Sequence, residues 1–462
     1  MGALTLRLLA RILFPSSMTT RPTRRAFLKS TTAGASLLFG APALLSAKAP
    51  NETVRVAGIG VGGKGWTDIN GAAKFGDVIA YCDIDTGKNR KGGYGAAAEK
   101  WPKAAGYTDF RKLIEKEHEN LDAVTISTPD HMHAAITMTA MEHGLAVYTQ
   151  KPLTRTVHEA RALTLAAKKH GVSTQMGNQG HSGPGYRTLV KIVQSGTIGK
   201  IKAAHAWSNR PIWPQGIDRP AGSDPVPKSV DWDLWLGVAP ERPYKRDAYH
   251  PFKWRGWFDF GAGALGDMGC HIIDPVVWAL ELGPPNSVSY SGPKPNTETF
   301  PKTEVLTYRF PGTKHTAGDE LTMQWHDGGK RPSSEGTHLP GDGAIPSQGS
   351  MFIGTEGTLV CAHHAMPKLY PDEKFAGTEL PRADGVDHYG NWIDGIRTGK
   401  APGSNFAYAG PMTETVLLGV IASRVGEGKL LWDAEKLRFT DSEAASAFVQ
   451  QEYRKGWEVE GL

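Results

Sequence analysis

Short apolar runs alternate with amphipathic stretches along the chain after residue 50. The apolar run at 54–60 breaks into glycines, which is typical of a buried parallel strand that ends in a loop. Similar runs follow at 77–82, 123–127 and 146–149. Stretches with helical spacing lie between and after them, at 66–75, 86–101, 110–117, 134–143 and 157–170. This alternation predicts a parallel sheet with crossover helices.

The pattern changes beyond about residue 180, where long loops rich in Gly and Pro separate strand-like stretches. These stretches lie at 201–207, 287–291, 304–310, 320–325 and 350–359. They predict a mostly antiparallel open sheet with helices on one face. Helices are expected at 386–397 and 412–426, and the second of these is expected to close back onto the first domain.

The fold class expected from these patterns is an α/β Rossmann domain with a parallel sheet, followed by an α+β domain with a large open, mostly antiparallel sheet. We place the first domain at 50–178 and the second at 179–440. The remaining residues, 441–462, are expected to form a C-terminal tail that packs back.

Residues 1–49 differ from the rest of the chain, because they hold seven Lys and Arg residues and no acid. Arg24 and Arg25 stand in a twin-arginine pattern, a weakly apolar stretch follows, and Ala47-Lys48-Ala49 offers a cleavage site. We predict a twin-arginine signal peptide that exports the folded protein to the periplasm or another extracytoplasmic space. A disordered basic tail is the alternative. Translation from Met18, directly before the signal, also stays open.

Net charge and composition exclude two classes of partner. The seven positive charges of residues 1–49 exceed the formal net charge of the whole chain, which is +5, so the rest of the chain has a slightly negative net charge. It carries no row of basic residues that could bind nucleic acid. No apolar run reaches the ~18–20 residues that span a bilayer, and no permanent membrane anchor is expected. The three cysteines, Cys82, Cys270 and Cys361, fit folding in a reducing cytoplasm before export.

A glycine-rich motif lies between the first strand and the first helix. It reads Gly60-Val61-Gly62-Gly63-Lys64-Gly65, a G-x-G-x-x-G sequence. Glycines allow the backbone to turn sharply and to approach a pyrophosphate, whose charge meets the helix N-terminus. An overlapping frame (Gly58, Gly60, Gly63) is the alternative, but a tight turn at the strand end favours the later one.

Asp83 ends the second strand about 20 residues further on. Its carboxylate can accept hydrogen bonds from both ribose hydroxyls and would repel a 2′-phosphate, so NAD is the expected cofactor. Lys88, Arg90 and Lys91 lie close enough to keep NADP possible.

Two further motifs follow strands whose carboxyl ends line the same crevice. In Ser127-Thr128-Pro129-Asp130-His131-Met132-His133 we expect Thr128, Pro129 and His133 beside the cofactor and His131 to be structural. Two histidines two residues apart, without paired cysteines, make a poor zinc site. In Gln150-Lys151-Pro152 the lysine is expected to point into the crevice beside Gln150, although a solvated surface lysine is the alternative.

A glycine-rich segment, 261–274, runs into a helix that carries Asp267 and His271 four residues apart, on one face. A carboxylate beside an imidazole orients the ring, which suits a general base for an alcohol proton. Asp274 falls on the same side and leaves a metal alternative open. We expect no metal, because one histidine with two aspartates is a poor ligand set for a transition metal.

Taken together, these motifs resemble the Gfo/Idh/MocA family, the glucose–fructose oxidoreductase and inositol dehydrogenase group, over about residues 50–440. The resemblance implies an NAD(P)-dependent sugar oxidoreductase with Lys151, Asp267 and His271 as catalytic residues. His271 would take the hydroxyl proton, Asp267 would hold His271, and Lys151 would polarise the substrate oxygen. The sequence departs from the family at Gln150, where Glu is usual, and this is expected to affect cofactor affinity or the protonation of Lys151.

Candidate substrate ligands combine aromatic faces, which stack on sugar C–H surfaces, with groups that bind hydroxyls or acids. Most aromatic residues between 231 and 260 are expected to be core. The residues expected to contact substrate are Gln179, His181, Tyr186, Arg210, Trp254, Arg255, Asp267, His271 and His388.

Export narrows the expected function, because free NAD is a cytoplasmic cofactor and an exported dehydrogenase could not replace one that dissociates. We therefore expect a tightly held NAD that is reduced and reoxidised within one cycle. One chemistry couples the oxidation of one sugar to the reduction of another. A second oxidises a ring hydroxyl transiently, as in some related glycosidases, so that a glycosidic bond can be eliminated.

A non-catalytic sugar-binding protein is the alternative of another class. A homodimer or homotetramer through the open sheet is expected, and the sugar and the oxidised carbon stay open.

Overall fold

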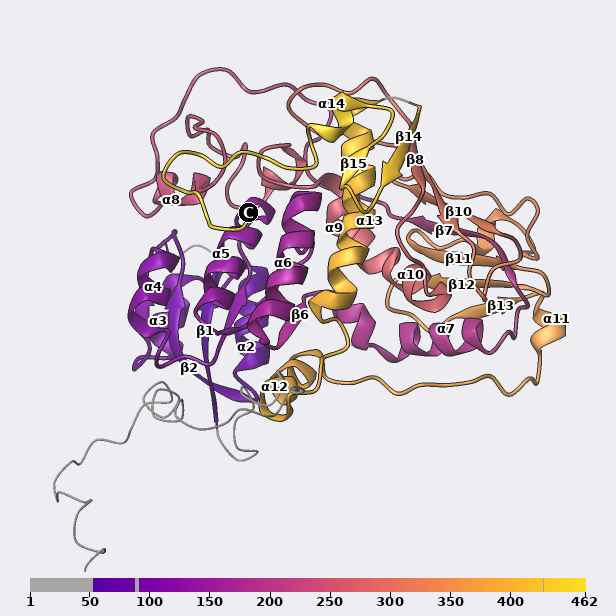
Figure 1. Ribbon diagram of the computed structural model, residues 1–462, viewed down its shortest axis with the longest axis horizontal. Helices are drawn as coiled ribbons and strands as arrows, with labels where there is room; N and C mark the ends of the chain where they lie inside the picture. The colour runs from indigo at the N-terminus through magenta and orange to yellow at the C-terminus, as the bar shows by residue number, and fades with distance from the viewer. Residues whose placement is uncertain (1–52, 88–90, 427) are drawn as a thin grey trace, which may run out of the picture. The chain divides into compact units, whose positions relative to one another are not determined.

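The computed structural model describes residues 53–87, 91–426 and 428–462, which belong to one compact unit. The predicted signal peptide and the two cations at Lys88 and Arg90 lie outside the described residues. Two sheets organise the described chain (Figure 1), a six-stranded sheet with the order β3-β2-β1-β4-β5-β6 and a nine-stranded sheet with the order β13-β12-β11-β7-β10-β9-β8-β14-β15.

Every pairing in the six-stranded sheet is parallel. Its strands are β1 (Val54–Ile59), β2 (Gly76–Cys82), β3 (Ala105–Tyr107), β4 (Ala123–Ile126), β5 (Ala146–Thr149) and β6 (Thr174–Met176). All residues of β4 and β5 are buried, as expected of strands covered on both faces. The predicted Rossmann-type parallel sheet is confirmed.

The crossover helices of this domain are α2 (Lys64–Ala72), α3 (Tyr94–Lys100), α4 (Phe110–Glu117), α5 (Asp130–Glu142) and α6 (Val157–His170). Local signals set their ends. Thr156 and Glu159 form a capping box at the start of α6, and Gly171 ends it in the left-handed region with φ 62°. The helix predicted over 86–101 was wrong in its first half, because Gly92 and Gly93 have positive φ values and delay the helix to Tyr94.

The second sheet is mixed and mostly antiparallel, as predicted. Its strands are β7 (Ile201–Trp207), β8 (Ser287–Ser291), β9 (Val305–Pro311), β10 (Glu320–His326), β11 (Gly349–Gly354), β12 (Thr358–Ala362), β13 (Lys368–Tyr370), β14 (Lys429–Asp433) and β15 (Arg438–Phe439). Only β7 and β10 pair in parallel within it. The single strand predicted at 350–359 was wrong, because the chain turns between Gly354 and Gly357 and divides this segment into β11 and β12.

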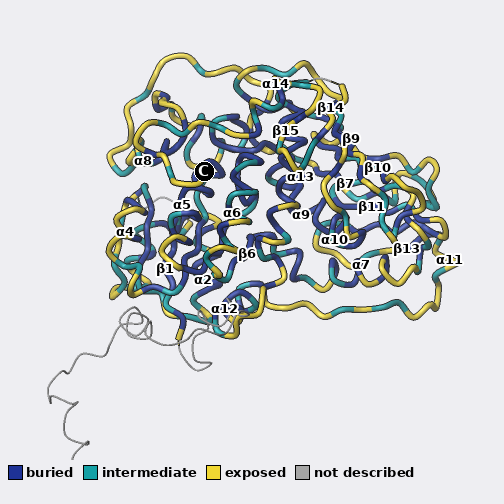
Figure 2. The backbone as a smooth tube through the Cα atoms, viewed as in Figure 1, coloured by how far each residue is buried: buried dark blue, intermediate teal, exposed yellow. Residues whose placement is uncertain are grey.

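Alternation along the strands gives the nine-stranded sheet one buried and one polar face. In β9, Leu306, Tyr308 and Phe310 are fully buried, whereas Thr307 and Arg309 are not. On the polar face Arg309 donates to Thr322 of β10 at 2.6 Å. Helices cover the other face (Figure 2), namely α7 (Pro184–Gln194), α9 (Gly263–Ile272), α10 (Asp274–Leu280) and α13 (Phe406–Val425).

Helix α13 joins the two domains, because it packs against both α6 and the second sheet. Arg161 of α6 makes two hydrogen bonds to Glu414 of α13, at 2.7 and 2.8 Å. The helix starts six residues before the predicted one, since Asn405 caps it. Shorter helices are α8 (Trp232–Leu236), α11 (Asp372–Phe375), α12 (His388–Thr398) and α14 (Glu443–Ser446). None of the described helices is both long and apolar enough to cross a membrane.

The C-terminal segment returns to the parallel-sheet domain and ends near α5 (Figure 1). Arg454 anchors it, donating to Asp233 and to the carbonyl oxygen of Gly237 at 2.6 and 2.9 Å. Trp457 packs against the Arg111 guanidinium, 4.2 Å from the ring centroid. The last residues therefore contact α4 of the first domain.

Candidate active site

The glycine-rich loop has the geometry that a bound pyrophosphate requires. Gly60 directly follows β1 and has a φ of 76°, which favours glycine. A Cβ on Gly65 would lie 1.7 Å from the carbonyl oxygen of Gly60, so only glycine lets α2 start this close to the strand. These two roles match the frame Gly60, Gly62, Gly65, and the loop presents the N-terminus of α2 to an anion.

A cavity beside this loop lies at the carboxyl ends of β1, β2 and β4. Asp83 lines it with 6% of its surface exposed, and its carboxylate accepts hydrogen bonds from the amides of Val61 and Asp85, each at 3.1 Å. The lining is mostly apolar and includes Ile59, Gly60, Gly62, Thr108, Phe110, Thr128, Pro129, Met132, Leu234, Trp235, His250 and Trp457. An apolar pocket that joins a ribose-binding carboxylate to a phosphate loop fits the adenosine half of NAD.

Within the Ser127–His133 motif the structure separates cofactor-facing from supporting residues. Thr128 and Pro129 line the cavity, and the Thr128 hydroxyl is buried without a partner in the described chain. The ring of His133 instead lies between the carbonyl oxygens of Pro152 and Thr128, at 2.7 and 2.9 Å. His133 therefore ties this loop to Pro152 and is not among the residues that line the cavity, so its place beside the cofactor stays a prediction. His131 contacts the carbonyls of Phe260 and Trp235 and is structural, as we expected.

Lys151 and Asp267 form the central pair of the site. The Lys151 Nζ atom donates to Asp267 Oδ1 at 2.6 Å and to the Asp267 carbonyl oxygen at 2.8 Å. Both side chains are about one-eighth exposed, so Lys151 is not a solvated surface lysine. Arg255 adds a second cation, with its Nε 3.4 Å from Asp267 Oδ1. Burial would raise the pKa of Asp267, but the charges of Lys151 and Arg255 outweigh it and hold the pKa below its usual value.

His271 lies one turn further along α9 and does not pair with Asp267. No hydrogen bond joins the two side chains in the described structure, and the Nδ1 atom of His271 is buried without a partner. The predicted Asp267–His271 contact is wrong, because the carboxylate is held by two cations instead. Burial, reinforced by the Lys151 charge, places the pKa of His271 well below 6.5. The ring is therefore neutral near pH 7 and able to accept a proton.

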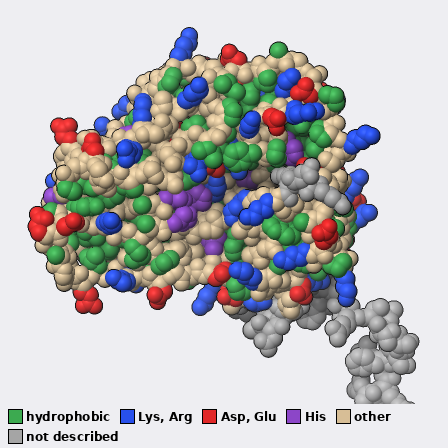
Figure 3. All heavy atoms as spheres, turned by 180° about the vertical axis from the view of Figure 1, so that it is seen from behind, with side chains coloured by type: hydrophobic (Ala, Val, Ile, Leu, Met, Phe, Trp, Pro, Cys, Tyr) green, Lys and Arg blue, Asp and Glu red, His purple; other side chains and the backbone are tan. Residues whose placement is uncertain are grey.

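Two neighbouring histidines that sequence reasoning missed face His271 from the second sheet. His363 and His364 follow β12, and their ring centroids lie 5.4 and 6.1 Å from that of His271. Figure 3 shows histidine side chains gathered in a hollow of the surface, with Lys and Arg side chains beside them. The only sequence signal was a pair of adjacent histidines after an apolar strand. This pattern indicates no function by itself, because only the fold places the pair beside α9.

The third residue of the metal alternative is directed elsewhere. Asp274 starts α10, and its carboxylate lies 3.0 Å from His181 Nδ1 and accepts from Tyr408 at 2.5 Å. Asp267, His271 and Asp274 therefore do not converge. Among the residues that the structure describes, no group of three potential ligands is arranged to hold a metal ion.

The remaining predicted substrate ligands differ in their neighbours. Tyr186 bonds to His363 at 2.9 Å, which places it beside the histidine group. Arg210 donates to Asn209 at 2.7 Å, and its charge helps to lower the pKa of Asp267, so Arg210 lies on the side of the site. Gln179 donates to the hydroxyl of Tyr148 at 2.9 Å.

Two histidines of the predicted substrate set are buried. His181 stacks on Trp278, with ring centroids 3.9 Å apart, and is 3% exposed. His388 is held through both ring nitrogens, by Ser182 and by the carbonyl of Met176, at 2.7 and 3.0 Å. Their role as substrate ligands stays a prediction.

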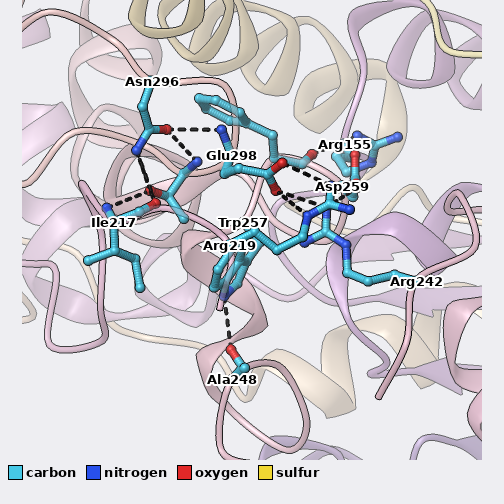
Figure 4. Close-up of polar contacts among 11 residues, drawn as sticks. Arg155, Ile217, Arg219, Arg242, Ala248, Trp257, Asp259, Asn296 and Glu298 are labelled. Atoms are coloured by element: carbon cyan, nitrogen blue, oxygen red, sulfur yellow. Dashed lines mark hydrogen bonds and ion pairs between the residues drawn. The ribbon is translucent and has the colours of Figure 1, made fainter. Parts of the chain in front are cut away.

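Most aromatic residues before α9 form a core beside a buried arginine. Figure 4 shows Arg242, which donates to Asp259 and Glu298 at 2.5 and 3.1 Å. Its guanidinium lies 5.5 Å from the ring centroid of Trp257. Trp254 belongs to the same core and is 6% exposed. Its partly buried neighbour on the site side is Arg255, whose guanidinium lies 4.3 Å from the Trp254 ring centroid. Trp254 therefore supports Arg255 rather than offering an open face to a sugar.

Asp130 connects the cofactor loops to the catalytic helix and was also missed. Its carboxylate accepts a hydrogen bond from the amide of Ala262, immediately before α9, at 3.1 Å. Burial, opposed by the charges of Arg255 and Lys151, raises the pKa of Asp130 to about 7. The buried carboxyl thus ties the start of α5 to the start of α9.

Comparison with known protein families assigns both domains. A family model described as the oxidoreductase family, NAD-binding Rossmann fold, matches residues 53–178. The model of the oxidoreductase family C-terminal alpha/beta domain matches residues 186–314. The first match agrees with the phosphate loop and the Asp83 pocket, so the N-terminal domain is an NAD-binding Rossmann domain.

Curated relatives are similar over part of their length. Levoglucosan dehydrogenase of Pseudarthrobacter phenanthrenivorans is 28% identical over 168 residues, 36% of this chain and 34% of that protein. The 2,7-anhydro-N-acetylneuraminate hydratase of Mediterraneibacter gnavus is 28% identical over 102 residues, 22% of this chain and 27% of that protein. The chain thus spans about a third of the length of these relatives.

Solved structures show the same fold over nearly their whole length. The WlbA dehydrogenase of Bordetella pertussis, crystallised with NADH and UDP-GlcNAcA, aligns with a TM-score of 0.56 at 16% identity. The alignment covers 83% of this chain and 99% of that one. The two family models together match more than half of the chain, and the two sheets match the fold of these structures. The protein therefore belongs to the Gfo/Idh/MocA family of oxidoreductases.

Proposed function

We propose that this protein is an NAD-dependent oxidoreductase that acts on a hydroxyl of a sugar, a sugar derivative or a glycoside. The observation that carries the proposal is the Lys151–Asp267 pair beside a neutral, unpartnered His271. Lys151 lies two residues after the end of β5, which pairs with β4, and β4 in turn pairs with β1, whose carboxyl end carries the glycine-rich loop. Curated relatives named as dehydrogenases of levoglucosan, apiose and inositol support the same substrate class.

The cofactor's part is to accept and return a hydride at the nicotinamide ring. The chain would hold it through the glycine loop, Asp83 and Thr128, which line one cavity or border it. The protein side chains would act on protons and on the orientation of the substrate.

Proton transfer falls to His271. Its ring is neutral because burial and the Lys151 charge disfavour the imidazolium, so it can accept the hydroxyl proton as a carbonyl forms. Lys151 has three N–H donors, and two of them point to Asp267. The third is free to hydrogen-bond the substrate oxygen and to stabilise its developing negative charge. General base catalysis of this kind contributes about 10²–10⁴-fold.

We further propose that the cofactor is held tightly and is recycled in place. Support comes from the adenosine cavity, whose wall combines the Rossmann strands with Trp235, His250 and Trp457 from distant segments. Export by the twin-arginine route, which the leader sequence favours, would make a retained cofactor necessary.

A redox-neutral reaction is the second candidate. Transient oxidation of a ring hydroxyl would acidify the neighbouring C–H, allow elimination, and end with the cofactor in its starting state. The relative named as a hydratase favours this candidate, since its name describes no net oxidation.

The deciding experiment measures nicotinamide in the purified protein by mass spectrometry after extensive dialysis, followed by a screen of sugars and glycosides. Stoichiometric NAD with turnover that yields no free NADH supports recycling, and the products separate sugar-pair oxidoreduction from glycoside cleavage. Protein that never contains or binds NAD would overturn the proposal. His271→Ala tests the non-catalytic alternative, because a sugar-binding protein would keep its full function without this base.

A further inference from the structure

A buried carboxylate on α2 gathers donors from four parts of the chain. Asp68 is fully buried, and its Oδ1 accepts from Lys64 Nζ and from the Tyr389 hydroxyl, each at 2.7 Å. Its Oδ2 accepts from Ser127 and from the side-chain amide of Gln150, at 2.8 and 2.9 Å. Four donors around one carboxylate satisfy a charge that would otherwise be costly to bury.

The surrounding backbone is shaped for these partners. A Cβ on Gly177 would lie 2.4 Å from Gln150 Nε2, and a Cβ on Gly71 would lie 2.5 Å from the ring of Tyr389. Any larger residue at these positions would displace the side chains that reach Asp68. The two glycines therefore leave the space that lets Gln150 and Tyr389 reach the carboxylate.

The contact with Gln150 bears on the departure from the family motif. The resemblance to the family implies Glu at this position, directly before the lysine, whereas Gln150 is neutral and donates to Asp68. A carboxylate at 150 would face the Asp68 carboxylate at about the same 2.9 Å, and like charges this close repel strongly in a buried site. The site therefore accommodates a negative charge at position 68 or at position 150, but not at both.

We propose that Asp68 supplies, from helix α2, the buried negative charge that the family motif places at position 150, and that it is the positioning residue for the cofactor-facing side chains around it. The proposal goes beyond the sugar chemistry above, because it requires only that the Rossmann domain binds NAD.

Each partner of Asp68 lies next to a segment that borders the cofactor crevice, or packs onto such a segment. Gln150 also accepts a long hydrogen bond from the Lys151 amide, at 3.4 Å. Ser127 precedes the cavity-lining Thr128, and Lys64 is the first residue of α2, beside the phosphate loop. Tyr389 brings α12 of the second domain onto α2. Removal of the charge would release all four groups together, whereas a charge restored at 150 could hold Lys64 and Ser127 again.

A charge-relocation cycle tests this proposal, with Asp68→Asn, Gln150→Glu and the double variant. The readouts are the NADH dissociation constant, by energy transfer from tryptophan after removal of bound nucleotide, and the midpoint of thermal unfolding. We expect each single variant to weaken NADH binding about tenfold, which lies within the range of coupling between contacting residues. The double variant should recover to within about threefold of the native protein.

Asp77→Asn is the matched control, because it removes an exposed carboxylate on β2 and should change neither readout. A double variant that is no better than the weaker single variant would overturn the proposal, as would single variants with native affinity. If Asp68→Asn does not fold, Gly177→Ala gives the second test, because it displaces the Gln150 amide without a change of charge and should weaken NADH binding in the same direction. Catalysis enters none of these measurements, so an inactive protein would count against the proposed function alone.

Discussion

Lys151 and Asp267 lie 116 residues apart in sequence, yet the ammonium of the lysine contacts both the carboxylate and the backbone carbonyl of the aspartate. The double contact fixes the position of Nζ and leaves one of its three N–H groups for another partner. Because Asp267 also meets Arg255, the carboxylate neutralises only part of the positive charge. A site that retains positive charge suits an oxygen that becomes negative as its proton leaves.

Lys151→Met is expected to lower kcat by about 10²–10⁴-fold while leaving the cofactor in place, because the substrate oxygen loses its polarising donor. Turnover and nicotinamide content, measured on the same preparation, check this prediction. Lys168→Ala, at an exposed position of α6, is the control. A Lys151→Met protein with native turnover would show that the pair with Asp267 is structural.

The acid limb of the pH–rate profile should lie well below pH 6.5. His271 must be neutral to accept a proton, and burial together with the Lys151 charge lowers its pKa. Activity should therefore stay level as the pH falls through 7 and 6, where an ordinary histidine would become protonated. In Lys151→Met the pKa of His271, measured by NMR titration, should rise because a nearby cation is lost. An acid limb near 6.5 in the native protein would contradict this assignment.

Trp457→Ala should release the cofactor faster, by about tenfold, because it removes one aromatic wall of the adenosine cavity. The retained nicotinamide, followed over time during dialysis, measures the effect. Trp432→Ala is a matched control, since Trp432 is equally buried, at 8% exposure, but belongs to β14 in the second sheet. Equal release from both variants would indicate general destabilisation rather than an open pocket.

Two buried carboxyl groups in the second domain should make the fold less stable as the pH rises. Glu304 and Asp327 are 3% and 1% exposed, and Asp327 Oδ1 accepts from the Glu304 amide at 2.8 Å. Burial and mutual repulsion raise the pKa of Glu304 well above its usual value, and burial raises that of Asp327 to about 7. Both groups stay protonated in the folded protein while they ionise in the unfolded chain.

Folding stability should therefore be fully present below about pH 4 and should decline as the pH rises from there to about 7 and beyond. Glu304→Gln should flatten this decline, because one of the two groups can no longer ionise. Unfolding midpoints between pH 4 and 8 measure it, and the exposed Glu320→Gln serves as the control. A stability that rises over this range in the native protein, with no effect of Glu304→Gln, would contradict the link between folding stability and the raised pKa values of these two groups.

The sequence alone determined the parts of this protein that depend on local backbone chemistry. Glycines at 60 and 65 are required by a positive φ and by a close approach of helix to strand, and such requirements are visible in a short motif. The buried strands of the first domain and the helix over 157–170 could be predicted for the same reason. Lys151, Asp267 and His271 could be named because the motifs that contain them are contiguous.

Only the tertiary structure decided which side chains meet. Helical spacing suggested that Asp267 orients His271, but a buried carboxylate gains more from two cations than from a neutral imidazole, and these cations come from Lys151 and Arg255. Likewise, the sequence shows Gln150 only as the loss of a negative charge from the family motif, and only the fold shows that Gln150 donates to Asp68. Long-range pairs of this kind arise when strand ends and distant helices are packed together, and no local pattern records them.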